Sequence, residues 1–117
     1  MSILKAFNNH LNEFADDFIL LFPNEPRLES GHVILKQIIN NKPETVINLW
    51  KEKVNEKYQK DIEKGDVEFW LNKDFNGGVV GEIQSKLKTM TDGDKLKTVK
   101  YIQNLTKLCN LHFMNKE

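Results

Sequence analysis

Apolar residues near the start of this chain recur at alternating steps of three and four, and this spacing constrains the fold more than any other feature. Lys5, Asn9 and Asp16 fall on the opposite face, and Ser2 is in position to cap the amino end. The apolar members are Leu4, Phe7, Leu11, Phe14, Phe18 and Leu21. The pattern predicts an amphipathic helix of about five turns.

Prolines divide the next part of the chain. Pro23 and Pro26 end the first helix, because proline cannot donate a helical hydrogen bond and disfavours helical geometry in the residue before it. Pro26 also suits the first position of a second helix that runs to the Asn40-Asn41 pair. Pro43 opens a third helix in the same way, with an acidic residue in its first turn.

The third helix has two possible forms. It either runs unbroken to Ile62 or bends near Asn55, and the sequence leaves both open. Gly65 is typical of the residue that follows a helix, and Asp66 is a natural cap for the next one. The apolar stripe of the third helix is Val46, Ile47, Leu49, Trp50 and Val54.

Two more helical stripes lie in the last third of the chain. The first consists of Val79, Val80, Ile83, Leu87 and Met90, and the second of Val99, Ile102, Leu105, Thr106, Cys109 and Phe113. Asp92-Gly93-Asp94 predicts a turn between them. Five or six such helices predict an all-α fold, a single compact bundle, and 117 residues is the size of one domain, residues 1–117.

Residues 65–82, "GDVEFWLNKDFNGGVVGE", allow two local structures. Asn76-Gly77 resembles the turn of a β-hairpin. A short helix from Asp66 to about Asn72, followed by a glycine loop, is the interpretation that we favour. An isolated hairpin is only marginally stable, and the glycines of the second arm would weaken a strand.

The aromatic side chains of this stretch are its largest apolar groups. We expect Phe69, Trp70 and Phe75 to close one end of the bundle. The functional alternative is that one of them, most plausibly Trp70, stays partly exposed as an anchor for a protein partner, because tryptophan is enriched in such positions.

No motif for phosphate or calcium is complete. "GGVVG" at 77–81 has no following Lys-Ser/Thr, so its glycines are expected to be loop residues. Asp92-Gly93-Asp94 begins like a calcium loop, but Gln103 stands where a bidentate glutamate is needed. The sequence therefore predicts no cofactor and no metal.

Nucleophile and histidine patterns are equally incomplete. His10, His32 and His112 lie on three different predicted helices, and none has a second histidine one turn away. Cys109 falls on an apolar stripe, where a thiol is a small, unreactive core group. We therefore expect the protein not to be an enzyme.

Charge limits the classes of partner. Seventeen Lys and Arg balance seventeen Asp and Glu, and zero net charge disfavours general binding to nucleic acid. Charge is unevenly distributed, with an acidic start and a basic end, which could let copies pack head to tail. Lys97, Lys100 and Lys107 form a row on the last helix that could contact phosphates or an acidic protein surface. A solvated helix face is the alternative.

Cellular setting is indicated by three features. The single Cys109 cannot form an intramolecular disulfide, and the start of the chain lacks the apolar run of a secretion signal. The longest apolar run, Phe18 to Phe22, is far shorter than the ~20 residues of a membrane span. These features favour a soluble, intracellular protein that is not in a membrane.

Three blocks of sequence carry a family resemblance over nearly the whole chain. They are "FNNHLNEFADDFILLFP" at 7–23, "WKEKVNEKYQKDIEKGDVEFWLNKDF" at 50–75 and "KYIQNLTKL" at 100–108. In this order they resemble a family of small uncharacterised proteins of nucleocytoplasmic large DNA viruses, the giant viruses of algae and protists. That family brings no assigned activity and no site residues.

The resemblance implies a viral protein made in an infected cell and located in the host cytoplasm or viral factory, or packaged in the virion. Combined with the residue patterns, it predicts a non-enzymatic helical domain that binds another protein or itself. A regulator associated with nucleic acid, acting through the lysine row, is one alternative. A minor virion component is the other.

Overall fold

The computed structural model describes residues 2–65, 67–72 and 78–114, and within these ranges the chain forms helices and turns but no strand. Its elements are α1 (Ile3–Leu21), α2 (Pro26–Asn41), α3 (Thr45–Trp50), η1 (Lys51–Asn55), α4 (Glu56–Glu63), α5 (Val67–Asn72), α6 (Gly78–Leu87) and α7 (Asp92–Met114). Because α3, η1 and α4 are continuous, they form one helix, and the predicted all-α bundle of five to six helices is confirmed.

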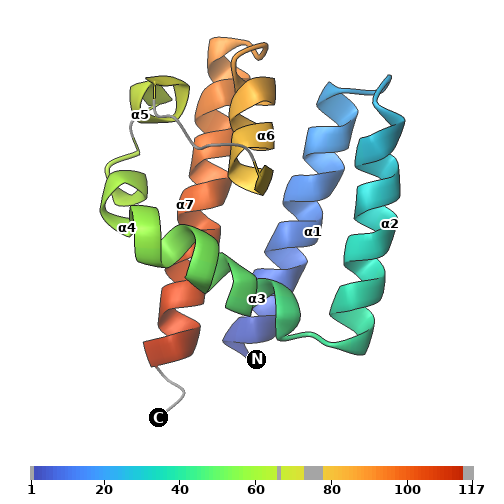
Figure 1. The fold of residues 1–117 in the computed structure, drawn as a ribbon, viewed down its shortest axis with the longest axis vertical. Helices are drawn as coiled ribbons and strands as arrows, with labels where there is room; N and C mark the ends of the chain where they lie inside the picture. Colours follow the sequence, from blue (N-terminus) through green and yellow to red (C-terminus); the bar gives the residue numbers. More distant parts are fainter. Residues whose placement is uncertain (1, 66, 73–77, 115–117) are drawn as a thin grey trace.

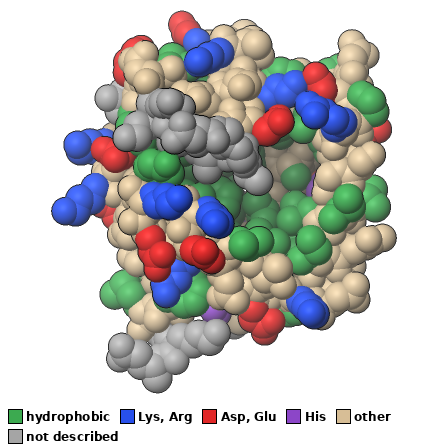
Figure 2. Space-filling model, viewed as in Figure 1, with side chains coloured by type: hydrophobic (Ala, Val, Ile, Leu, Met, Phe, Trp, Pro, Cys, Tyr) green, Lys and Arg blue, Asp and Glu red, His purple; other side chains and the backbone are tan. Residues whose placement is uncertain are grey.

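The two longest helices, α1 and α7, lie side by side and antiparallel (Figure 1). The α2 helix packs against α1, and the α3–η1–α4 run crosses the lower part of the bundle to reach α7. In the space-filling view, hydrophobic side chains gather in a hollow over α1, between α6 and α2 (Figure 2). The other helices therefore leave part of the hydrophobic surface of α1 uncovered on this face of the molecule.

The core is built around one face of α7. Its buried side chains follow the predicted stripe: Thr98, Val99, Ile102, Leu105, Thr106 and Cys109. The α1 helix contributes Phe7, whose ring meets that of Trp50 edge to face at 6.0 Å between centroids. Burial of such aromatic and aliphatic groups supplies the main favourable free energy of folding.

A π-helical turn, η1, answers the question that the sequence left open near Asn55. The run to Glu63 is unbroken, but the Glu56 N–H donates to the Lys51 carbonyl, five residues back. This wider turn brings residues five apart onto one side. Trp50 Nε1 then donates to Thr106 Oγ1, and Asn55 Nδ2 donates to the Thr106 carbonyl, both at 3.1 Å.

Two helix starts differ from the sequence prediction. The third helix begins at Thr45 rather than at Pro43, because the Thr45 N–H donates to the Lys42 carbonyl in a tight turn. Asp92-Gly93-Asp94 is the first turn of α7, not a break before it. Thr91 Oγ1 accepts from the Asp94 N–H at 3.2 Å, and aspartates suit a helix amino end.

The glycine-rich stretch is helical where it is described. Gly78 and Gly81 belong to α6, so the expectation that they are loop residues was wrong, and helices on both sides exclude a hairpin. Gln84 Nε2 donates to the Trp70 carbonyl at 2.8 Å and joins α6 to α5. Such tertiary contacts outweigh the low helix propensity of glycine. Asn76-Gly77 lies outside the described residues, as does Asp66.

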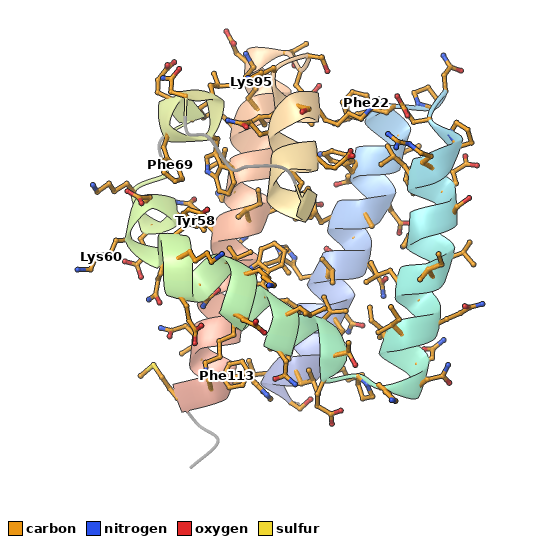
Figure 3. All side chains as sticks on the ribbon, viewed as in Figure 1. Phe22, Tyr58, Lys60, Phe69, Lys95 and Phe113 are labelled. Carbon is orange, nitrogen blue, oxygen red and sulfur yellow. The ribbon has the colours of Figure 1, made fainter. Side chains whose placement is uncertain are left out.

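An ion pair joins α6 to the turn between α1 and α2. Lys86 Nζ lies 2.8 Å from Glu25 Oε1 and 5.2 Å from the centre of the Phe22 ring, which is labelled in Figure 3. The hydrogen bond and positive charge of Lys86 lower the pKa of Glu25. The carboxylate is therefore held in its charged form next to the ammonium group.

Truncation of the α7 core stripe tests the packing. We expect Leu105→Ala, at a fully buried position, to lower the free energy of unfolding by about 2 to 5 kcal/mol. Leu96→Ala, on the same helix but 60% exposed, should change it by about 0.5 kcal/mol or less. Urea unfolding measures both, and equal losses would contradict the assigned core.

Two glycines form a second matched pair. Gly65 has φ +66°, and an added Cβ would lie 2.7 Å from Gln103 Nε2, so Gly65→Ala should destabilise by about 1 kcal/mol or more. Gly31 is in the interior of α2 with no atom near its Cβ position, so Gly31→Ala should stabilise by about 0.5 to 1 kcal/mol. Thermal unfolding should therefore shift in opposite directions, and a shared direction would contradict the Gly65 conformation.

Candidate functional site

Of the three aromatic residues predicted to contact a partner, two are packed in the structure and one lies outside the described residues. Trp70 is only 1% exposed, so the alternative of a partly exposed anchor does not hold. Phe69 is partly buried, with its ring 5.6 Å from that of Trp70 and 6.3 Å from that of Tyr58 (Figure 3). Both rings close the end of the bundle near α5, as expected. Phe75 lies outside the described residues.

The three lysines of the row on α7 have different surroundings. Lys97 Nζ lies 3.8 Å from Asp17 Oδ2 on α1. Lys100 and Lys107 point outward, and within the described chain neither has an ion-pair partner. Because each helical residue turns by about 100°, Lys107 is rotated by roughly 80° about the helix axis from Lys97. The row is therefore a neutralised lysine beside α1 and two free ones on the outer face.

A pocket between α1 and α7 combines an apolar floor with a charged rim. It has a volume of about 140 Å³. Its lining is Phe14, Asp17, Phe18, Leu20 and Leu21 from α1, with Asp94, Lys97, Thr98 and Tyr101 from α7. Leu20 is 76% exposed and Leu21 is 39% exposed, so the apolar surface continues from the pocket onto the outside of α1. We call this the α1–α7 pocket.

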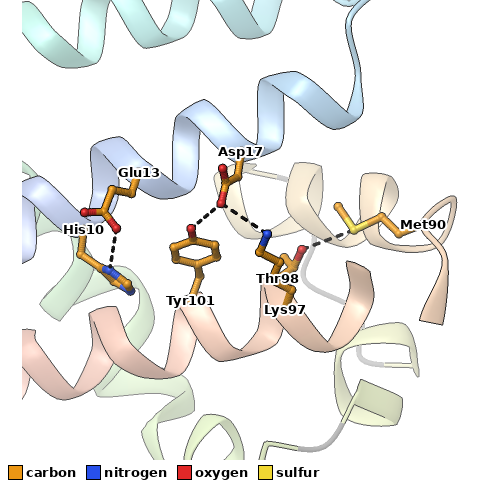
Figure 4. Close-up of polar contacts among 7 residues, drawn as sticks. All are labelled: His10, Glu13, Asp17, Met90, Lys97, Thr98 and Tyr101. Atoms are coloured by element: carbon orange, nitrogen blue, oxygen red, sulfur yellow. Dashed lines mark hydrogen bonds and ion pairs between the residues drawn. The ribbon is translucent and has the colours of Figure 1, made fainter. Parts of the chain in front are cut away.

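Asp17 organises the rim of the pocket. Its carboxylate accepts a short hydrogen bond from the Tyr101 hydroxyl and pairs with Lys97 (Figure 4). The hydrogen bond to Asp17, together with burial and the negative charges of Asp17 and Glu13, raises the pKa of Tyr101 to about 12. The His10 ring lies 5.0 Å from that of Tyr101 and continues the contact between the two helices.

Carboxylates outnumber lysines around this pocket. Asp94 lines it, and within the described chain its carboxylate has no ion-pair or hydrogen-bond partner. Glu13 and Asp16 lie on neighbouring turns of α1, 67% and 64% exposed, and face His10 and His32. One lysine, Lys97, lines the pocket. The rim therefore carries a net negative charge.

Tyr101 and Cys109 both have raised pKa values. With its raised pKa, Tyr101 keeps its proton at neutral pH and cannot act as a general base there. Cys109 is fully buried away from the pocket, its Sγ donates to the Ile47 carbonyl at 3.5 Å, and burial raises its pKa to about 11. The expectation that Cys109 is a core thiol is confirmed.

A second groove, between α4 and α7, is larger, with a volume of about 430 Å³. Three of its polar side chains take part in hydrogen bonds. Gln59 Nε2 donates to Glu63 Oε1, and Gln103 Nε2 donates to the Ile62 carbonyl, both at 3.0 Å. Lys107 lies on the α7 wall of this groove, not on that of the α1–α7 pocket. We therefore regard the α1–α7 pocket as the stronger candidate.

Two further classes of site can be assessed from the described chain. Within it, no group of three or more His, Cys, Asp or Glu side chains lies close enough to hold a metal ion. None of the helices over the same residues is both long enough and apolar enough to cross a bilayer.

The pocket itself was missed at the sequence level. Its apolar floor, Phe14 and Phe18, was assigned to the core stripe of the first helix. The available signal was Leu20, an apolar residue on the same helix face as Glu13 and Asp16. The pairing of Tyr101 with Asp17 had no signal, because it depends on how α1 and α7 are placed side by side.

Stability at alkaline pH tests the Tyr101–Asp17 contact. Because the folded-state pKa of Tyr101 lies above its ordinary value of 10.0, the contact stabilises the fold below pH 10 and is lost as pH rises toward about 12. We expect Tyr101→Phe to reduce this alkaline loss of stability, measured by urea unfolding at a series of pH values. The control variant Tyr58→Phe should retain it. An unchanged pH profile in Tyr101→Phe would contradict the contact.

Comparisons with known proteins do not assign the chain to a family. No protein-family model matches the chain, and neither a curated protein nor a solved structure was found to match it.

Proposed function

We propose that this chain is a non-enzymatic protein-binding domain of a large DNA virus, and that the α1–α7 pocket receives an apolar side chain of the partner. The observation that carries the proposal is the exposed Leu20–Leu21 pair at the edge of an apolar pocket. Exposed apolar surface that continues into a concave site is typical of protein interaction sites.

The size of the pocket limits what can enter. Its volume of about 140 Å³ is close to that of an engineered apolar cavity of about 150 Å³ that binds benzene. One aromatic ring or one branched aliphatic side chain therefore fits. Leu20 and Leu21 would cover the rest of the partner residue from the side.

The charge of the rim limits what surrounds the anchor. Asp94 has no partner within the described chain, and the exposed Glu13 of α1 adds its negative charge near Tyr101. A partner with lysine or arginine beside its apolar anchor would complement these carboxylates. Such complementarity favours the correct partner and speeds association more than it strengthens binding.

The viral assignment and the location rest on the family resemblance. That resemblance supports a protein of the host cytoplasm or viral factory, or a minor virion component. The non-enzymatic part of the proposal is supported by the raised pKa of Tyr101 and the burial of Cys109.

Nucleic acid is the alternative partner. Lys100 and Lys107 are exposed and without ion-pair partners in the described chain, so they are available to phosphates. Lys97 is neutralised by Asp17, and the zero net charge of the chain provides no long-range attraction. Two free lysines make a weak and salt-sensitive phosphate contact, so a protein partner is favoured.

Capture from infected cells tests the proposal. We expect the tagged protein to retain partners after nuclease treatment and Leu20→Glu to lose them, because a buried carboxylate would oppose docking. Val33→Glu, at a 57% exposed position on α2, is the matched control and should keep them. Partners detected by mass spectrometry that vanish with nuclease, or that bind Leu20→Glu normally, would contradict the proposal.

A further inference from the structure

The outer face of α7 complements the α1–α7 pocket in both polarity and charge. We call it the lysine face and define it by Lys100, Asn104, Lys107, Leu111 and Met114, all exposed. Leu111 is 37% exposed and Met114 is 65% exposed, so apolar groups lie next to lysines that have no ion-pair partner among the described residues. The pocket has a different arrangement, an apolar floor with the carboxylates of Asp17 and Asp94 and one lysine, Lys97, at its rim.

The two surfaces lie at opposite ends of the same helix. The α7 residues of the pocket, Asp94 to Tyr101, are in its amino-terminal half, and Leu111 and Met114 are in its last turns. At 1.5 Å per residue, Lys97 and Leu111 are separated by about 21 Å along the axis. Because α1 is antiparallel to α7, Leu20 and Leu21 are at the pocket end (Figure 1).

The two surfaces also face nearly the same side of the molecule. At about 100° per residue, Lys100 and Lys107 are rotated from Lys97 by roughly 60° and 80° in the same sense. One flat partner surface can therefore reach both the pocket and the lysine face. This arrangement is self-complementary if the partner presents the same two surfaces in reverse order.

We infer that the partner of the α1–α7 pocket is a second copy of this chain. Two α7 helices pack antiparallel about a two-fold axis, Leu111 and Met114 of each copy cover the pocket of the other, and Lys107 meets the acidic rim. This inference rests on the proposed function of the pocket. Two-fold dimers are the commonest protein assemblies, and they use one self-complementary patch twice.

Charge favours this arrangement of the two copies. The chain has no net charge, so two copies do not repel each other over long distances. In the antiparallel arrangement with Asn104 on the axis, Lys107 of one copy lies opposite Tyr101 of the other, beside Asp17 and the exposed Glu13 of α1, and Met114 lies opposite Asp94. A parallel arrangement would instead place like charges opposite each other, which is destabilising.

Symmetry identifies the residue at the centre of the interface. Asn104 is midway along α7 between Lys97 in the pocket and Leu111 on the lysine face, and its side chain is exposed. A residue on a two-fold axis meets its own counterpart in the other copy. Asn104 of one copy is therefore expected to face Asn104 of the other.

Sedimentation of the purified full chain tests association. The wild-type protein should form dimers as its concentration rises through the micromolar range, and added salt should weaken them. Lys107→Glu and Leu20→Glu should each remain monomeric, and an equimolar mixture of these two variants should not regain the wild-type dimer. Lys57→Glu, an exposed reversal of charge on α4, should dimerise normally. A wild type that stays monomeric throughout, or a normal Lys107→Glu dimer, would overturn the inference.

Cysteine cross-linking tests the symmetry directly. Under mild oxidation we expect Asn104→Cys to form a disulfide-linked dimer much faster than Gln37→Cys, an exposed position on α2. The buried Cys109 contributes little to either variant. Equal rates for the two variants would overturn the two-fold arrangement.

The same variants separate this inference from the proposed function. If the wild type is monomeric but Leu20→Glu still loses partners from infected cells, the pocket binds a different protein and the inference is overturned. If dimers form but Leu20→Glu neither weakens them nor changes capture, both the inference and the pocket's role are overturned.

Discussion

Two hydrogen bonds to Thr106 are the constraint on which the rest of this structure depends. Trp50 reaches its hydroxyl and Asn55 its carbonyl, and all three side chains are buried. A buried polar group without a partner costs about 1 to 3 kcal/mol, so these groups fix how the two segments face each other. The π turn is the backbone change that allows Trp50 and Asn55 to reach the same residue of α7.

With α7 held in this way, its two sides acquire different roles. One side receives α1, where Asp17 binds both Tyr101 and Lys97 and the adjoining surface remains open as the α1–α7 pocket. The other side keeps Lys100 exposed, and its carboxyl-terminal part, with the exposed Lys107, borders the groove between α7 and α4. The neutral chain thus has an acidic surface and a basic surface at opposite ends of α7. This separation of charge suits protein association.

Periodicity predicted the helices because burial of one face requires it, as the stripe ending at Cys109 shows. The π turn at Lys51–Asn55 was not predictable, since it depends on buried partners contributed by a distant segment. Trp70 illustrates the same limit, because an apolar residue in a short segment flanked by glycines in the sequence can be core or surface until its neighbours are known. The candidate pocket was missed for this reason. Periodicity did place Lys97, Lys100 and Lys107 on an exposed face, but it could not predict the pairing of Lys97 with Asp17.

The central claim is that protein association involves the α1–α7 pocket together with the lysine face. A dilution series of two-dimensional amide NMR spectra tests it most directly, because each backbone amide reports its own surroundings. The account predicts concentration-dependent shifts in the second half of α1 and along α7, with α2 and α4 unchanged. Shifts centred on α2 or α4, or none at any concentration, would contradict it.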